Sequence, residues 1–202
     1  MRGLVINLLG ACVGDAETVA RARQVVAHSE TVDPDVAASC VSVVASHGSA
    51  GDFEEYVRRA TRGSNPQEQL RYLYSLGDFP EQALVLRADE LALTDAVRSQ
   101  NAPFLLQRTL RNREHGAAAW QFVADHWSAV RARCSGSLLA RMLEGTTWLV
   151  DDPTFGDVTA FVRAHPVPEA ARVIEQHLDR LRVHRRTVAR ERERFAAALA
   201  AG

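Results

Sequence analysis

The sequence contains no lysine, so arginine supplies all 24 of its basic residues, against 25 acidic residues. The formal net charge of −1 is not the clear basic excess that general nucleic-acid binders and proteins of anionic membrane surfaces normally carry. The absence of lysine also excludes a P-loop, because the lysine of that motif contacts the bound phosphates. We therefore expect no nucleic acid and no membrane among the partners of this protein.

Cysteine is scarce as well. Cys12, Cys40 and Cys134 are odd in number, far apart and without a C-x-x-C pair, so the sequence predicts neither a disulfide framework nor a zinc knuckle. This usage fits a reducing compartment, and we expect a cytoplasmic protein. An alternative is a short signal sequence that ends in a lipoprotein-type cysteine at Cys12, after the apolar run 4–9. The short run and its single preceding basic residue favour an amphipathic helix instead.

Strand-like alternation of apolar and polar residues is missing, and apolar residues recur at helical spacing instead. Asp33, Asn65 and Asp152 each precede a proline, a pattern typical of a helix cap followed by the first helical turn. Gly14 suits a helix end. The pattern predicts helices near 2–13, 15–28, 34–47, 50–62, 66–76, 79–91, 103–112, 116–133, 136–150, 154–164 and 167–199.

Short helices joined by tight turns form pairs, and stacked pairs form a solenoid. We therefore predict an all-α fold: a single helical domain over residues 1–202, built as an armadillo/HEAT-like superhelix of antiparallel helix pairs and ending in a long C-terminal helix. In that last helix, Ile174, Leu181, Val188 and Phe195 lie seven apart and form one apolar seam. Its other sides carry mixed charge, which is typical of a solvated surface, and a nucleic-acid contact is the less favoured alternative.

The stretch 97–127 contains two of the three tryptophans and predicts a helix hairpin. Its first helix begins near Pro103, where the missing N–H costs nothing, and a short loop, 111–115, leads into the second. Cys134 follows the apolar side of the second helix and is interpreted as a small core residue. The residues predicted to face the core are Leu106 and Leu110 in the first helix, and Trp120, Val123, Trp127 and Val130 in the second.

Three stretches carry motifs in a fixed order. Residues 8–15 contain Leu, Ala-Cys and Gly-Asp; residues 99–127 contain Ser-Gln-Asn, Asn, Gly, Ala-Trp-Gln-Phe and His-Trp; and residues 144–162 contain Glu-Gly-Thr-Thr, Phe, Val and Phe-Val. Together they resemble the C-terminal helical domain of the zinc aminopeptidases similar to aminopeptidase N and the ER aminopeptidases, the gluzincin family. The departures are Arg113 for the usual proline, Asn101 for a frequent aspartate, and Ala117 and Ala118 where a basic residue is common.

The resemblance implies a non-catalytic superhelical domain of a zinc aminopeptidase, which removes N-terminal residues from peptides. Such a domain would cap the zinc site, wall an internal chamber, limit which peptides enter, and move between open and closed arrangements. The implied partners are the catalytic domain of the same polypeptide and a peptide substrate. An apolar helix that begins at Gly3 without a capping residue is expected if the chain is part of a longer polypeptide.

Catalysis in this family uses a helix that bears His-Glu-x-x-His, with both histidines on zinc. None of the seven histidines here is followed by glutamate, and the Gly-x-Met-Glu-Asn strand that grips the substrate amine is missing. We therefore predict no catalytic and no metal-binding residue in this chain, and expect zinc in the catalytic domain of the parent enzyme. His177 and His184 lie two turns apart, and we interpret them as surface imidazoles beside arginines, because no third ligand is suitably spaced.

The candidate peptide-binding residues are Gln107, Arg108, Arg111 and Asn112. They lie opposite the apolar side of their predicted helix and present two guanidinium groups, which suit carboxylate recognition. If the family resemblance holds, a concave-facing arginine of this domain would meet the C-terminal part of a peptide. The alternative is a solvated convex surface. An alternative for the whole chain is a self-standing helical-repeat scaffold that binds a protein or peptide partner in its groove.

Overall fold

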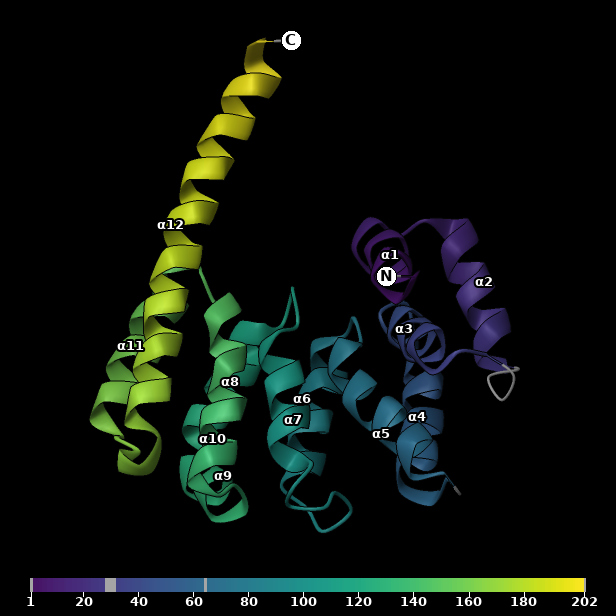
Figure 1. Ribbon diagram of the computed structural model, residues 1–202, viewed down its shortest axis with the longest axis horizontal. Coiled ribbons are helices and arrows are strands. Elements are labelled where there is room, and N and C mark those ends of the chain that lie inside the picture. Colours follow the sequence, from purple (N-terminus) through teal and green to yellow (C-terminus); the bar gives the residue numbers. More distant parts are fainter. Residues whose placement is uncertain (1, 28–31, 64, 202) are drawn as a thin grey trace. The chain divides into compact units, whose positions relative to one another are not determined.

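The computed structural model of the protein describes residues 2–27, 32–63 and 65–201. These residues form helices joined by short connections and contain no strand (Figure 1). Residues 1–97 and residues 98–202 each form a compact unit. The predicted all-α fold and its long C-terminal helix are thus confirmed, whereas the armadillo/HEAT-like superhelix and the single domain over 1–202 stay predictions. In the described ranges, no helix is both long and apolar enough to cross a membrane.

Local capping explains where several helices of the first unit begin. The side chain of Asp33 accepts hydrogen bonds from two backbone N–H groups of α3, and Asn65 does the same for α5. Gly14 ends the first helical segment with a positive φ of 75°, a conformation that glycine adopts without strain. The elements of this unit are α1 (Arg2–Asn7), the π-helix η1 (Leu8–Val13), α2 (Ala16–Ala27), α3 (Pro34–Ala45), α4 (Ala50–Arg62), α5 (Pro66–Ser75), the 3₁₀-helix η3 (Leu76–Asp78) and α6 (Gln82–Ala92).

The core of the first unit contains a cluster of aromatic rings. Phe53 and Tyr56 of α4 both lie edge-on to Phe79, with ring centroids 5.1 and 5.3 Å apart, and Tyr56 also lies edge-on to Tyr72 of α5 at 4.8 Å. All four rings are buried, and the Tyr56 hydroxyl donates a hydrogen bond to the Val41 carbonyl of α3. Buried aromatic pairs of this geometry dominate the packing energy of small cores.

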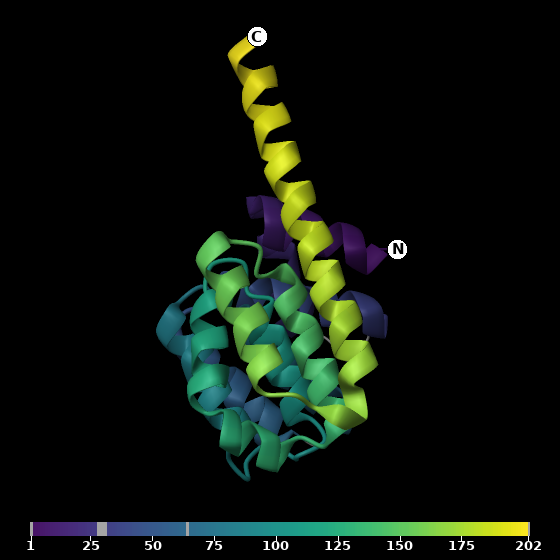
Figure 2. The same ribbon diagram turned by 90° about the vertical axis from the view of Figure 1, so that its left-hand side faces the viewer.

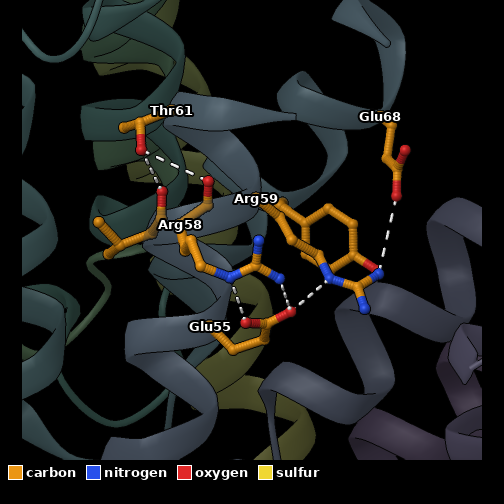
Figure 3. A network of polar contacts seen from close by, with 7 residues as sticks. Glu55, Arg58, Arg59, Thr61 and Glu68 are labelled. Atoms are coloured by element: carbon orange, nitrogen blue, oxygen red, sulfur yellow. Dashed lines mark hydrogen bonds and ion pairs between the residues drawn. The ribbon is translucent and has the colours of Figure 1, made fainter. Parts of the chain in front are cut away.

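A polar network joins α4 to α5 (Figure 3), and its Arg59 guanidinium lies over the Tyr72 ring. Glu55 accepts hydrogen bonds from Arg58 and Arg59, which lower the pKa of its carboxyl group to about 2. Arg59 also donates to the Tyr72 hydroxyl at 2.7 Å and lies 3.7 Å from the carboxylate of Glu68. The network is internally paired, so we interpret it as a structural link between the two helices.

The second unit is built on the predicted hairpin. The helices α7 and α8 contact each other across the turn 111–115, and all six residues predicted to face the core are buried. Trp120 and Trp127 both lie edge-on to Phe161 of α11. The elements are α7 (Ala102–Leu110), α8 (Gly116–Asp125), α9 (Trp127–Arg133), α10 (Gly136–Leu143), the 3₁₀-helix η4 (Glu144–Trp148), α11 (Asp152–Ala164), the 3₁₀-helix η5 (Pro168–Ala170) and α12 (Ala171–Ala201).

Two predicted helices are interrupted. The helix expected over 116–133 breaks at His126, whose Nδ1 bonds the Phe122 carbonyl and whose ring stacks on the Phe122 ring, so α8 and α9 are separate. The helix expected over 136–150 tightens to a 3₁₀-helix after Leu143, and the hydroxyls of Thr146 and Thr147 donate to carbonyls three residues earlier.

The long helix α12 changes environment along its length. In its first half Ile174, Leu178 and Leu181 are buried against the second unit, as the apolar seam predicts. Further along the same seam Val188 is half-buried and Phe195 is exposed, and the helix extends beyond the other helices of its unit (Figure 2). The seam is therefore core only up to the middle of the helix.

Candidate functional site

The polar surface that we consider the candidate site lies on the second unit, where η4 packs between α7 and α12. Gly145 makes this packing possible, because a Cβ atom there would lie 2.7 Å from the Gln107 carbonyl oxygen and 2.8 Å from the Leu110 Cβ. Both atoms belong to a rigid helix and cannot easily move away. The close approach brings the side chains on either end of η4 next to those of α7.

Glu144, at the start of η4, is the hub of this surface. Its carboxylate accepts hydrogen bonds from Gln107 of α7 and Arg141 of α10, both at 3.1 Å, and from Arg180 of α12 at 3.2 Å. Partial burial by itself raises the pKa of Glu144, but the hydrogen bond from Arg141 and the surrounding positive charges outweigh burial and lower the pKa. Two guanidinium groups around one carboxylate leave the cluster with a positive charge.

Trp148, at the other end of η4, presents an exposed aromatic ring. Trp148 is 57 % exposed, and the guanidinium of Arg111 lies over its ring, 5.4 Å from the ring centroid. The His184 ring of α12 lies 5.4 Å from the same ring, and its Nδ1 bonds the Thr147 carbonyl at 2.8 Å. We name the residues Gln107, Arg111, Glu144, Trp148, Arg180 and His184 the η4 surface.

Two of the four candidate peptide-binding residues contact η4 in the structure, and the other two have different surroundings. Gln107 and Arg111 lie one helical turn apart and both contact η4, so they belong to the η4 surface. Asn112 instead shapes the turn before α8, where its side-chain oxygen accepts hydrogen bonds from the backbone N–H groups of Glu114 and His115. Arg108 is half-buried and already takes part in interactions within the protein.

A comparison with protein families identifies the family to which the chain belongs. A family model described as "ERAP1-like C-terminal domain" matches residues 1–183, which is nearly the whole chain. The chain belongs to the family of ERAP1-like C-terminal domains. The match ends inside α12, close to the point at which that helix leaves the core of its unit.

Two curated proteins of rice, Oryza sativa subsp. japonica, are similar to this ERAP1-like C-terminal domain. "Aminopeptidase M1-B" is 30 % identical over 125 residues, and "Aminopeptidase M1-A" is 28 % identical over 127 residues. Each alignment covers 60 % of this chain but only 14 % of the relative. The chain thus spans a small fraction of the length of the curated relatives that it matches.

The described residues of this ERAP1-like domain do not offer a zinc site. In the ranges that the structure covers, no group of three or more His, Cys, Asp and Glu side chains is placed to hold a metal ion, and catalytic zinc needs three protein ligands. The thiol of Cys134 is buried, as predicted, and burial raises its pKa to about 11.

Several residues of the η4 surface were not predicted as site residues. Glu144 belongs to a family motif but was not predicted to bind anything. The sequence does not indicate that Trp148 is exposed, and it does not distinguish Arg180 from the other arginines of the last helix. The interpretation of His177 and His184 as surface imidazoles was wrong. His177 is buried and its Nε2 bonds the Ala140 carbonyl of α10 at 3.1 Å, while His184 is half-buried and its Nδ1 bonds the Thr147 carbonyl of η4, because α12 packs on both elements.

We expect His177 to make the docking of α12 dependent on pH. Burial lowers the pKa of His177, and its Nδ1 is buried without a hydrogen-bond partner among the described residues, so a second ring proton would find no acceptor among them. Glu144 raises that pKa, whereas Arg180 and Arg141 lower it. The unfolded chain therefore binds this proton more readily than the folded chain, and the stability that neutral His177 provides is lost as the pH falls below about 6.5.

We expect His177→Gln to flatten the pH dependence of stability. The free energy of unfolding, measured in urea at a series of pH values from neutral to 5, should fall less steeply in this variant than in the unsubstituted chain. The matched control is His126→Gln, at an exposed position on the same unit. Equal slopes for the unsubstituted chain and the His177 variant would contradict this account of His177.

Proposed function

We propose that this chain is the non-catalytic C-terminal domain of a zinc aminopeptidase, and that it caps the active site and controls which peptides reach it. The family match over residues 1–183 and the two similar aminopeptidases support this proposal. In this function the partners are the catalytic domain of the same polypeptide, which would hold the zinc ion, and the peptide substrate. A cytoplasmic location is part of the proposal, since the three cysteines are free thiols.

The observation that carries the peptide contact is the η4 surface. It combines an exposed indole ring with guanidinium groups at Arg111 and Arg180, and its only carboxylate, Glu144, is already paired. An aromatic ring accepts an apolar side chain or a peptide plane, and guanidinium forks pair with a carboxylate. We propose that this surface holds the end of a peptide that carries its C-terminal carboxylate, away from the residue to be removed.

A binding experiment with the full 202-residue chain tests this contact. Two nine-residue peptides with identical sequence, one with a free C-terminal carboxylate and one amidated, are titrated while the tryptophan fluorescence of the chain is followed, to which Trp148 contributes an exposed ring and Trp120 and Trp127 buried ones. We expect the free carboxylate to bind about 5-fold more tightly, a difference of about 1 kcal/mol, as for an exposed ion pair of good geometry.

Arg111→Gln should remove this preference and leave the binding of the amidated peptide nearly unchanged. The matched control is Arg131→Gln, an exposed arginine on α9 of the same unit. The proposal fails if both peptides bind equally to the unsubstituted chain, or if the Arg131 variant loses the preference to the same degree as the Arg111 variant.

A further inference from the structure

The first helical segment of the chain is apolar on two opposite sides. Its inner side packs on α3, where Cβ atoms at Gly3 and Gly10 would lie 2.5 Å from side-chain atoms of Ser39 and Val43. Its outer side exposes large apolar residues in α1 and η1. A helix that is apolar all round is normally buried all round, but the residues that the structure describes leave the outer side of this segment exposed. The large apolar residues that it exposes are Leu4, Val5, Leu8, Leu9 and Val13.

A groove runs beside this outer side. A cleft of about 250 Å³ opens between α1–η1, α2 and α3, and a shallower hollow that shares three of its lining residues continues it toward Arg2. We name the two together the α1–α2 groove. Its lining is almost entirely apolar: Val5, Ile6, Leu9, Ala22, Val25 and Val36.

Two arginines flank the α1–α2 groove. Arg2 lines the shallow hollow and Arg21 lines the deeper cleft. Neither makes an ion pair or hydrogen bond with the residues that the structure describes, whereas Arg23, two residues further on, lies near Asp52. The carboxylate of Asp15, at the start of α2, is taken up by hydrogen bonds from Thr18. The groove thus offers an apolar floor with, at both ends, a positive charge that no described residue pairs.

The helical walls, apolar floor and arginines of the groove indicate which kind of segment it can bind. Within the described part of the first unit, every wall of the groove is helical and no strand edge is present, so an added β-strand would find no backbone partners. An apolar floor between helices accepts the apolar stripe of another helix. The two arginines favour a helix whose stripe is flanked by carboxylates. A second copy of the chain is disfavoured, because a two-fold contact would place Arg2 and Arg21 opposite the same arginines.

We propose that the α1–α2 groove receives an amphipathic helix with acidic residues beside its apolar stripe, supplied by the rest of the parent polypeptide. This inference rests on the proposed function, in which the chain is one part of a longer protein. The alignments cover only 14 % of each curated relative, so most of such a polypeptide lies outside the region described here. The docked helix would hold this domain to the remainder of the enzyme.

Two synthetic helical peptides of equal length test the proposal with the full chain. Both carry the same leucine stripe, flanked in one by glutamate and in the other by arginine, and binding is measured by fluorescence anisotropy of a labelled peptide. We expect the glutamate peptide to bind at least about 10-fold more tightly, and Arg21→Glu to reverse the preference.

Variants on the exposed leucines provide the matched control. Leu9 lines the deeper cleft and is 41 % exposed, and Leu199, on α12, is 69 % exposed, so Leu9→Glu and Leu199→Glu should both leave the thermal unfolding curve nearly unchanged. Only Leu9→Glu should abolish binding of the glutamate peptide. Equal binding of the two peptides, or equal loss in the two variants, overturns the proposal. A dimer in light scattering that Leu9→Glu dissociates also overturns it, in favour of a second copy.

This experiment is independent of the peptide contact at the η4 surface. Arg111→Gln should leave the binding of the helical glutamate peptide unchanged, because Arg111 belongs to the second unit and the groove to the first. Failure of the groove proposal therefore appears only with the helical peptides. Failure of the proposed carboxylate contact appears only with the nine-residue peptides.

Discussion

Replacing Trp120 with alanine should lower the free energy of unfolding of the second unit by about 3–5 kcal/mol. The Trp120 residue is only 2 % exposed, and its ring lies edge-on to Phe161 at 5.4 Å, so truncation leaves a large cavity in a packed core. Urea unfolding followed by tryptophan fluorescence measures this change, since all three tryptophans of the chain lie in the second unit.

Trp148→Ala is the matched control for this prediction. The Trp148 ring is exposed on the η4 surface, so its loss should change the free energy of unfolding by less than about 1 kcal/mol. If Trp148→Ala lowers the free energy of unfolding as much as Trp120→Ala does, the structure is wrong about which tryptophan lies in the core.

Phe79→Ala should have an effect of similar size on the first unit, again about 3–5 kcal/mol. The Phe79 side chain is fully buried, lies edge-on to Phe53 and Tyr56, and packs so closely on Gly48 that a Cβ atom there would meet it at 2.5 Å. Near-ultraviolet circular dichroism of tyrosine reports on this unit, because all three tyrosines lie in it.

Phe195→Ala is the matched control on α12, at a phenylalanine that is 67 % exposed, and should change the free energy of unfolding by less than about 0.5 kcal/mol. If Phe79→Ala leaves the tyrosine signal and its unfolding midpoint unchanged, the aromatic cluster does not hold the first unit together.

The hairpin of α7 and α8 illustrates what could be predicted from the sequence. Pro103 marks the first turn of α7, and Trp120, Val123 and Trp127 mark a buried side, because these signals are local and repeat with the period of a helix. The caps at Asp33 and Asn65 were predicted for the same reason: a side chain two or three residues away satisfies the free backbone groups.

One feature that the sequence did not reveal is local, and another depends on a distant contact. The break at His126 follows from the local bond and ring stacking at Phe122, but helical spacing continued through it and concealed it. His177 is buried because α12 packs on α10, and its bond to Ala140 spans 37 positions of the chain. A residue pattern along one helix does not show which neighbour will cover that helix.

The η4 surface contains residues that local spacing predicts and residues that only tertiary packing brings together. Gln107 and Arg111 were predicted to lie on one side of one helix, which requires only their spacing of one turn. Glu144 and Arg180, which complete the polar cluster, lie 37 and 73 positions beyond Gln107 and are brought in by tertiary packing. Nor does the sequence show that Trp148 is exposed, since tryptophan is more often buried.

The most direct measurement of the central claim uses an antibody raised against this chain to recover its parent protein from source-cell lysate. The account predicts a polypeptide several times larger than the 22.2 kDa chain, with aminopeptidase activity that a zinc chelator removes and added zinc restores. A protein of the size of the chain itself, without such activity, would contradict the account and favour a self-standing helical scaffold that binds a partner.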